Sequence, residues 1–246
     1  NEVKKLKDSN QYDELYDAVI SNNESESTLY VTENPGCTSI KEPDQNIIKE
    51  YFLDSRKEWF KVEKEIKVNT TTLDKIFYEK GIKVDWLKID VQGAEYEILE
   101  GSENLLRDLT VIILETSHLQ VYKNQKIIND LLQLLRQNNF DLVLTNYKPR
   151  FSIESDLVFV RNLNSINSFR DFISITTLFS ILKLDYVNKF IFDNLISNKL
   201  TEKEINSLKK ILNNAQKPLI NLNFKLLKIY TNRITFILKQ YLNNLF

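Results

Sequence analysis

The sequence predicts an α/β fold that contains a parallel βαβ unit, followed by an all-helical C-terminal extension. From about residue 84 to residue 162, short apolar runs rich in β-branched residues alternate with amphipathic stretches of helical spacing. After residue 163 the strand pattern stops, and no glycine occurs between residues 165 and 246. We therefore expect two domains, residues 1–163 and residues 164–246.

The elements expected before residue 84 are three strands and one helix. Short apolar or alternating patterns predict strands over residues 16–21, 28–33 and 61–69. In the last of these, apolar and charged residues alternate as in a half-exposed edge strand. Residues 71–81 predict a helix that begins with Thr71 or Thr72 as N-cap and stops at Gly81.

Residues 84–117 have the pattern of a βαβ unit. Residues 84–91 predict a strand, residues 94–108 a helix and residues 110–117 a second strand. The expected helix places four residues on one stripe, namely Ala94, Ile98, Ser102 and Leu105. The second strand has a continuous apolar core, which predicts burial on both faces, as in a parallel sheet.

The remaining part of the first domain predicts one helix and two closing strands. Residues 126–139 have helical spacing, with Ile127, Leu131, Leu134 and Leu135 facing inward. Residues 140–146 and 156–162 predict two strands, which we expect to form a hairpin at the edge of the sheet.

Composition indicates a soluble globular protein. Hydrophobic residues make up 42% of the chain and charged residues 27%. The single cysteine, Cys37, cannot form an internal disulfide and is expected to be a free, inert thiol, which fits a reducing, cytoplasmic setting. The longest uncharged apolar stretch, Phe172 to Leu182, is too short to span a bilayer.

Three polar residues lie where strands of this predicted sheet end. Asp90 closes the first strand of the βαβ unit, Glu115 closes the second, and His118 follows three residues later. Ligands of open parallel sheets bind beyond the carboxyl ends of the strands, so acid/base catalysis is one interpretation. The structural alternative is that Asp90 caps the next helix, Glu115 is a surface carboxylate and His118 is a loop residue.

The connection after Asp90 is short and contains Gln92 and Gly93. Glycine permits a backbone conformation or a close approach that a β-carbon would block, so a ligand could lie directly over Gly93. Asp90 is expected to lie near the N-terminal amides of the following helix, which favour an ionised carboxylate.

These segments resemble the FkbM-type methyltransferases. The resemblance rests on VDWLKIDVQGAEYEILEG, in which Lys88 to Glu95 carry the central pattern, and on TVIILETSHLQVYKNQ, which supplies Glu115 and Tyr122. The loop NPGCTS, residues 34–39, is similar to a loop in one branch of the family. The resemblance covers residues from about 12 to 162 and does not reach the helical extension.

The resemblance implies a Rossmann-like class I methyltransferase fold. It implies S-adenosylmethionine as cofactor and methyl transfer to a hydroxyl oxygen of a sugar, polysaccharide unit or natural product. Asp90, Glu115 and His118 would lie nearest the chemistry, and Asp90, Gln92 and Gly93 would contact the cofactor. A divalent metal ion held by Asp90 and Glu115 remains an alternative to simple acid/base roles.

One part of the family pattern is missing. Such enzymes open with a strand and a glycine-rich turn that holds the cofactor, but no glycine precedes Gly36. The chain also contains no methionine. We therefore expect the sheet to lack its first strands, through truncation at the N-terminus, and to lack much of its cofactor pocket.

The extension has a different charge balance and leaves a second hypothesis open. Residues 165–246 contain 12 of the 33 basic residues but only 5 of the 34 acidic ones. The helix expected after Pro218 has a basic face with Lys225, Lys228, Asn232 and Lys239. Packing on protein is the favoured interpretation, and contact with an anionic membrane surface is the alternative.

No basic and aromatic pattern of a nucleic-acid-binding module occurs, so no nucleic-acid partner is expected. The alternative to an enzyme is a non-catalytic methyltransferase-like module whose helical tail docks a biosynthetic partner. The expected partner of the enzyme itself is a small-molecule or carbohydrate acceptor.

Overall fold

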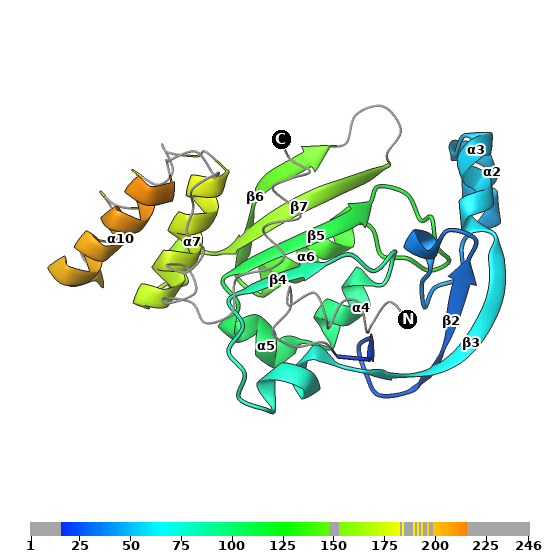
Figure 1. Cartoon of the computed structure of the whole chain (residues 1–246), viewed down its shortest axis with the longest axis horizontal. Coiled ribbons are helices and arrows are strands. Elements are labelled where there is room, and N and C mark those ends of the chain that lie inside the picture. Colours follow the sequence, from blue (N-terminus) through cyan, green and yellow to red (C-terminus); the bar gives the residue numbers. More distant parts are fainter. Residues whose placement is uncertain are drawn as a thin grey trace. The chain divides into compact units, whose positions relative to one another are not determined.

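The computed structural model describes residues 16–147, 153–182, 184, 189, 191, 193, 196 and 199–215. These residues belong to two compact units, one spanning Tyr16–Val160 and the other including the chain from Arg161 onward. Two β-sheets form the first unit, and helices dominate the second (Figure 1). The mixed α/β architecture expected for the first unit is therefore confirmed.

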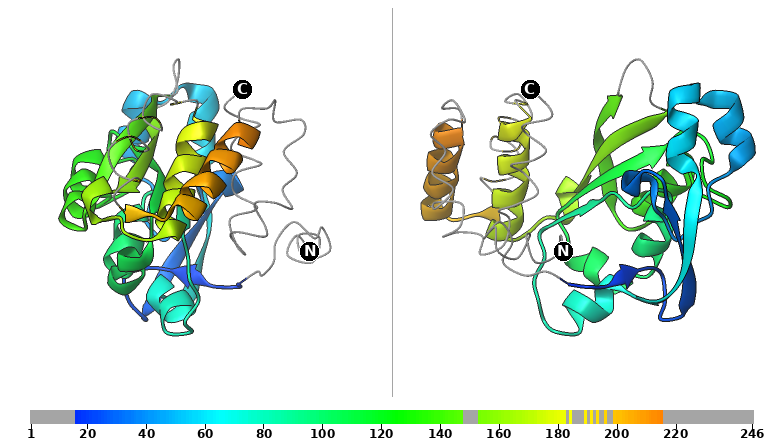
Figure 2. Two further views of the ribbon diagram at one scale, coloured as in Figure 1. Left: turned by 90° about the vertical axis from the view of Figure 1, so that its left-hand side faces the viewer. Right: turned by 45° about the vertical axis from the view of Figure 1, so that its right-hand side comes forward.

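The first sheet has three strands in the order β1-β3-β2. They are β1 (Val19–Ile20), β2 (Glu26–Thr32) and β3 (Val62–Thr71). β1 pairs with β3 in parallel, whereas β2 and β3 are antiparallel and form a long curved ribbon. The chain between β2 and β3 forms η1 (Pro35–Cys37), α2 (Gln45–Tyr51), α3 (Asp54–Lys57) and η2 (Glu58–Phe60). We call residues 45–60 the helical arm, and it lies at the far end of the ribbon (Figure 2).

The second sheet has four strands in the order β4-β5-β7-β6. They are β4 (Trp86–Ile89), β5 (Val111–Ser117), β6 (Phe140–Tyr147) and β7 (Glu154–Arg161). β4 and β5 are parallel, as expected for the βαβ unit, and β7 is antiparallel to β5. The two closing strands are neighbours as predicted, with β6 at the sheet edge and β7 inside it.

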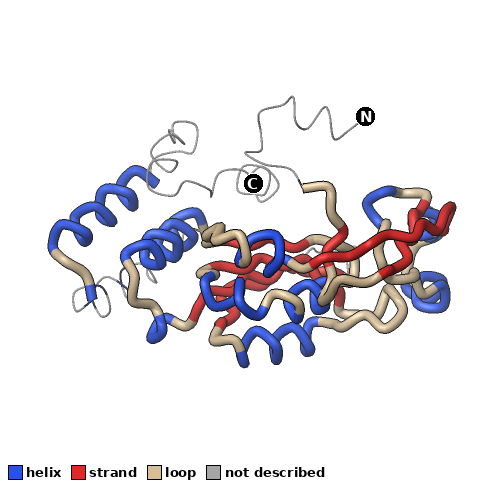
Figure 3. Tube along the Cα trace, turned by 90° about the horizontal axis from the view of Figure 1, so that it is seen from below, coloured by secondary structure: helices blue, strands red, loops and turns tan. Residues whose placement is uncertain are grey.

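Helices α4 (Glu95–Glu100), α5 (Glu103–Asp108) and α6 (Ile128–Gln137) pack on this sheet (Figure 3). One core cluster joins them to the strands through Ile98, Leu99, Leu105, Leu106, Leu131, Leu135, Ile112, Leu114, Leu157 and Phe159. Val111 and Ile113, on the other face of β5, are also buried. Burial of both faces of residues 111–114 is thus confirmed.

The helix predicted over residues 94–108 is two helices. α4 ends at Glu100 and α5 begins at Glu103, although the predicted stripe of Ala94, Ile98, Ser102 and Leu105 is buried throughout. The break coincides with Gly101, where a β-carbon would lie 2.6 Å from Asn22 Cα and 2.7 Å from the Ser21 carbonyl oxygen. Glycine is needed there because the backbone that follows β1 passes against the helix.

Two further element predictions before residue 84 were too long. The strand predicted over residues 16–21 is only Val19–Ile20, and the helix predicted over residues 71–81 is a π-helical segment, η3 (Asp74–Tyr78). β3 continues through the β-branched Thr70 and Thr71, which pair with β1 and delay the helix. The predicted stop at Gly81 is confirmed by its left-handed φ of 66°.

The second unit contains α7 (Phe169–Ile181) and α10 (Glu202–Ala215), which contact each other. A capping box begins α10: Thr201 N–H donates to Glu204 Oε2 at 2.9 Å, and Glu204 N–H donates to Thr201 Oγ1 at 3.4 Å. Within the described chain, no helix is long and apolar enough to cross a membrane. The basic helix expected after Pro218 lies outside the described residues.

Candidate active site

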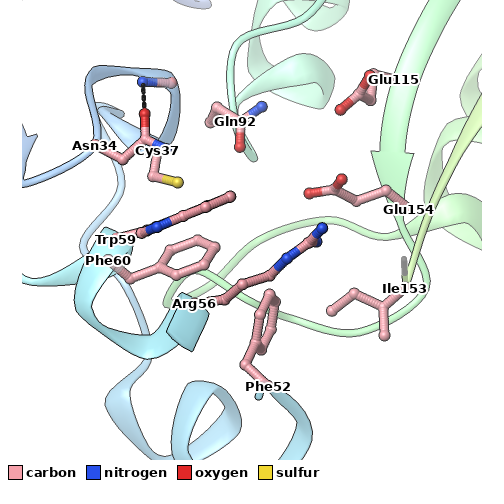
Figure 4. A pocket seen from close by; sticks show the side chains of 11 residues that line it. Asn34, Cys37, Phe52, Arg56, Trp59, Phe60, Gln92, Glu115, Ile153 and Glu154 are labelled. Atoms are coloured by element: carbon pink, nitrogen blue, oxygen red, sulfur yellow. Dashed lines mark hydrogen bonds between the residues drawn. The ribbon is translucent and has the colours of Figure 1, made fainter. Parts of the chain in front are cut away.

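A pocket of about 200 Å³ lies in the first unit (Figure 4). Its walls come from the loop after β2, the helical arm, the turn after β4, and the adjoining ends of β5 and β7. The lining residues are Asn34, Gly36, Cys37, Phe52, Arg56, Trp59, Phe60, Gln92, Glu115, Ile153 and Glu154. The pocket therefore lies at the carboxyl ends of the parallel strands β4 and β5, where the sequence placed the site.

Two carboxylates form the sheet side of the pocket. Glu115 pairs in register with Asp156, and Glu154 pairs with Ser117, so Glu115 and Glu154 extend from the same face of the sheet. Figure 4 shows both carboxylates directed into the pocket. Glu115 was a predicted site residue. Glu154 is an additional carboxylate, on the antiparallel strand β7.

The helical arm supplies the opposite, aromatic side. The rings of Phe52 and Phe60 meet edge to face, with centroids 4.9 Å apart. The Arg56 guanidinium carbon lies 5.2 Å from the centroid of the Trp59 ring, a cation–π contact. In Figure 4 this guanidinium extends toward Glu154. One cation, two carboxylates and three aromatic rings thus surround the pocket.

Cys37 lines the pocket with a thiol that stays protonated. Burial is the main cause that raises its pKa to about 11, and the charge of Glu154 adds to the effect while Arg56 opposes it. Cysteine attacks electrophiles and binds metal ions as the thiolate. With such a pKa, little thiolate is present at neutral pH. The prediction of an inert thiol is supported.

Asp90 does not line the pocket. It follows β4 directly, and its side chain is 38% exposed rather than buried in the strand. Lys88 Nζ forms an ion pair with its Oδ2 at 3.2 Å, and Gln92 Nε2 donates to its Oδ1 at 3.3 Å. Ile89 pairs with Leu114. The next residue along each strand is therefore Asp90 in one case and Glu115 in the other, so the two residues lie at neighbouring positions of the sheet.

The turn after Asp90 has the backbone that the sequence predicted. Gln92 and Gly93 have left-handed φ values of 58° and 98°, and Gln92 lines the pocket. A β-carbon on Gly93 would lie 2.8 Å from Cδ2 of the Tyr122 ring. The close approach at Gly93 is confirmed, but the neighbouring group is Tyr122 and not open space for a ligand.

Glu95, rather than Asp90, is the carboxylate that bonds to the amides of this turn. Its Oε1 accepts from Gly93 N–H at 3.0 Å and from Val91 N–H at 3.4 Å, and its side chain is buried. Burial raises its pKa to about 7, against the opposing effect of its hydrogen bonds to the backbone of Gly93, Glu95 and Val91. The amides of Gly93 and Val91, which precede α4, therefore bind Glu95, and the predicted interaction of Asp90 with the helix-terminal amides stays a prediction.

His118 lies apart from Glu115. Its Nε2 is 2.7 Å from Ser155 Oγ, and its backbone N–H donates to Ile153 O. Ser155 pairs with Thr116, so it extends from the opposite face of the sheet to Glu115. The pocket lining includes Glu115 and Gln92 but neither His118 nor Asp90. The catalytic roles of these residues stay predictions.

Comparison with known proteins identifies the family. The family model for the methyltransferase FkbM domain matches residues 3–142, more than half of the chain.

The chain belongs to the FkbM methyltransferase family.

A relative is the 2-O-methyltransferase NoeI of Sinorhizobium fredii, which is 32% identical over 106 residues. That match covers 43% of this FkbM chain and 40% of NoeI, so the chain spans about two fifths of its curated relative. No solved structure matches the chain at a significant level.

The FkbM pocket has no ready cage for a metal ion. Among the described residues, no three His, Cys, Asp or Glu side chains are grouped so that they could bind one. Asp90 forms an ion pair with Lys88 and does not line the pocket, whereas Glu115 does line it. The described residues therefore do not fit the divalent ion considered from the sequence.

Several pocket residues were not predicted from the sequence, among them Glu154, Arg56 and Trp59. Glu154 precedes the strand predicted to begin at residue 156, so its place at the sheet edge was hidden by a boundary error of two residues. Arg56 and Trp59 lie in the helical arm, for which no element was predicted. A signal was present in the four aromatic residues between positions 51 and 60 of an otherwise polar segment.

Proposed function

We propose that the chain transfers a methyl group from S-adenosylmethionine to a hydroxyl oxygen of a sugar, polysaccharide unit or other natural product. Family membership supports methyl transfer, and the relative named a 2-O-methyltransferase supports oxygen as the acceptor atom. The observation that carries the proposal is the pair Glu115 and Glu154 in an aromatic-lined pocket at the carboxyl ends of β4 and β5.

We place the acceptor in this pocket. A hydroxyl group is a poor nucleophile until its proton is accepted by a base, and carboxylates can serve as that base. Glu115 is our candidate to accept the proton, while Glu154 accepts hydrogen bonds from neighbouring hydroxyls and orients them. The aromatic rings of Trp59 and Phe60 offer flat apolar surfaces to the carbon-bound hydrogens of a sugar ring.

The size of the pocket supports recognition of one end of an acceptor. At about 200 Å³ it is smaller than the roughly 300–1,000 Å³ of pockets that enclose whole ligands. Trp59 is 40% exposed at its rim, so a longer acceptor could continue outward over it. A terminal or internal sugar unit of a larger molecule fits this arrangement better than a free small molecule that needs full enclosure.

We propose that the cofactor is held on the Asp90 side of the turn. The cofactor would supply the methyl group as a substituent of its sulfonium sulfur. The exposed carboxylate of Asp90 and the amide of Gln92 can bind its polar groups, and both residues follow a parallel strand end. The four-stranded sheet would then be the acceptor-side half of a Rossmann-like sheet, consistent with its parallel βαβ unit.

The decisive test measures methyl transfer from isotope-labelled S-adenosylmethionine to a panel of sugars and oligosaccharides, using this chain and the longest natural form that contains it. Glu115→Gln is expected to lower kcat about 100-fold, because the amide cannot accept the proton. Glu65→Gln, an exposed carboxylate of β3, is the matched control. Equal kcat in both variants would remove Glu115 from the mechanism, and absence of transfer to every hydroxyl acceptor would overturn the function.

A further inference from the structure

We propose that Tyr122 is a positioning residue that holds two walls of the pocket, the loop at Cys37 and the turn at Gln92, in the arrangement that acceptor binding requires. The proposal rests on the proposed function in one respect, because it takes this pocket as the acceptor pocket. Tyr122 itself does not line the pocket, so it would act only through the residues that do.

The phenol hydroxyl reaches both walls. It donates to the carbonyl oxygen of Cys37 at 2.9 Å, and Gln92 Oε1 lies 3.3 Å away as a second acceptor. Burial raises the pKa of Tyr122 well above its ordinary value, so the hydroxyl keeps its proton and remains a donor. The phenol hydroxyl of Tyr122 therefore links two chain segments that are far apart in the sequence, and both segments line the pocket.

The ring of Tyr122 adds contacts to the same segments and to a third. It lies so close to Gly93 that a β-carbon there would approach Cδ2 to 2.8 Å. It also meets the Phe60 ring of the helical arm edge to face, with centroids 6.1 Å apart. The side chain is 2% exposed, within a small core cluster that includes Cys37, Ile48, Phe60 and Val121.

The backbone of Tyr122 is fixed without help from its hydroxyl. Its N–H donates to Gln125 Oε1 at 3.2 Å, and Tyr122 forms a β-bridge with Pro43. The neighbouring carbonyl of Val121 accepts from Asp44 N–H at 2.8 Å. Removal of the hydroxyl alone should therefore leave the ring in place and release only the Cys37 loop and the Gln92 side chain.

A first experiment measures how accessible the Cys37 thiol is, and it does not depend on enzyme activity. Cys37 is the only cysteine of the chain, and it is buried against the pocket. We expect iodoacetamide at pH 8 to alkylate it about tenfold faster in Tyr122→Phe than in the wild type, because the loosened loop exposes the thiol. Tyr51→Phe, a 54% exposed tyrosine of the helical arm outside the pocket, should leave the rate unchanged.

A second experiment separates positioning from general loss of fold. With an acceptor identified by the methyl-transfer assay, Tyr122→Phe should raise KM for the acceptor about tenfold while kcat changes less than threefold, as expected when only binding geometry is lost. Gln92→Asn shortens one partner at a left-handed position that asparagine tolerates. It should raise KM in the same way but leave Cys37 alkylation slow.

Each outcome decides the proposal. An unchanged alkylation rate in Tyr122→Phe overturns it, whether or not methyl transfer is found. A faster rate accompanied by a matching loss of helical circular dichroism or of the cooperative thermal transition also overturns it, because the residue would then serve the fold in general. Faster alkylation in a folded variant of a chain without methyltransferase activity would uphold the coupling of the two walls and reject only the proposed function.

Discussion

The carboxylate of Glu95 lies 3.0 Å from the backbone nitrogen of Gly93, in the turn that carries Gln92 into the pocket. Its other oxygen, Oε2, is buried without a hydrogen-bond partner in the part of the chain that the structure describes. An ionised carboxylate in that position is poorly solvated, which is why burial raises the pKa of Glu95. The turn at the candidate site therefore rests on a group that titrates near neutral pH.

Glu95 should make the folded state less stable as pH rises from about 4.5 to 7. Its pKa is raised from the ordinary 4.5 to about 7 in the folded chain, so the folded state binds the proton more tightly across that interval. The stabilisation is complete below the unfolded pKa and is lost as pH rises through the folded one. In Glu95→Gln, urea unfolding at pH 5 and pH 7.5 should lack a decrease on the order of 2 kcal/mol that the wild type shows.

The matched control for this measurement is Glu100→Gln, an exposed glutamate of the same helix. It should keep the wild-type pH dependence. The same slope in Glu95→Gln and in the wild type would contradict the assigned pKa.

Gly101→Ala is expected to destabilise the chain by about 1–3 kcal/mol, because its β-carbon would meet the backbone at Asn22 and something must shift. Denaturant unfolding gives the difference directly. Gly81→Asn is the comparison, since nothing lies within 4 Å of a β-carbon there and asparagine tolerates the left-handed φ. Equal losses in both variants would show that backbone conformation, not the close approach, governs Gly101.

Lys41→Met should cost about 2 kcal/mol of the free energy of unfolding. Lys41 Nζ lies 2.7 Å from Glu97 Oε1, and the two side chains are only 13% and 21% exposed, so the variant leaves a carboxylate poorly compensated. Lys67→Met breaks a 3.6 Å pair whose side chains are 70% and 66% exposed, and should cost less than about 0.5 kcal/mol. A Lys41–Glu97 coupling energy near zero in a double-mutant cycle would refute the assignment.

Asp90→Asn should reduce methyl transfer about 100-fold while leaving the unfolding temperature almost unchanged, because its carboxylate is exposed and would contact the cofactor. Asp108→Asn is matched in chemistry, since Asp108 is 32% exposed and pairs with Lys83 at 2.8 Å. Transfer rates measured at saturating acceptor separate the two variants. Wild-type turnover in Asp90→Asn would remove this residue from the site.

Much of the second sheet could be predicted because its sequence signals are local. The continuous apolar run at residues 111–114 requires burial on both faces, and the periodic Leu131 and Leu135 require a helix packed on the sheet. Glu115 at a strand end followed from the same pattern. These features depend on neighbours in the sequence, which is what periodicity reports.

The errors arose where distant chain segments determine the structure. Gly101 breaks a helix because the segment after β1 passes against it. Glu95 binds two amides of the turn after β4, a role that the sequence pattern did not reveal. Similarly, Arg56 and Glu154 line one pocket, although 97 positions of sequence separate them. Residue patterns within one segment contain no information about such partners.

The pocket walls come from distant parts of the sequence, and this affects the order in which the chain folds. Asn34 and Glu154, at opposite ends of the pocket lining in the sequence, must both be in place before the cavity exists. Contacts over such separations form late, since a long loop must close before they stabilise anything. During synthesis the α4–β5 core can assemble first, and the site is completed only after β7 has emerged from the ribosome and paired with β5.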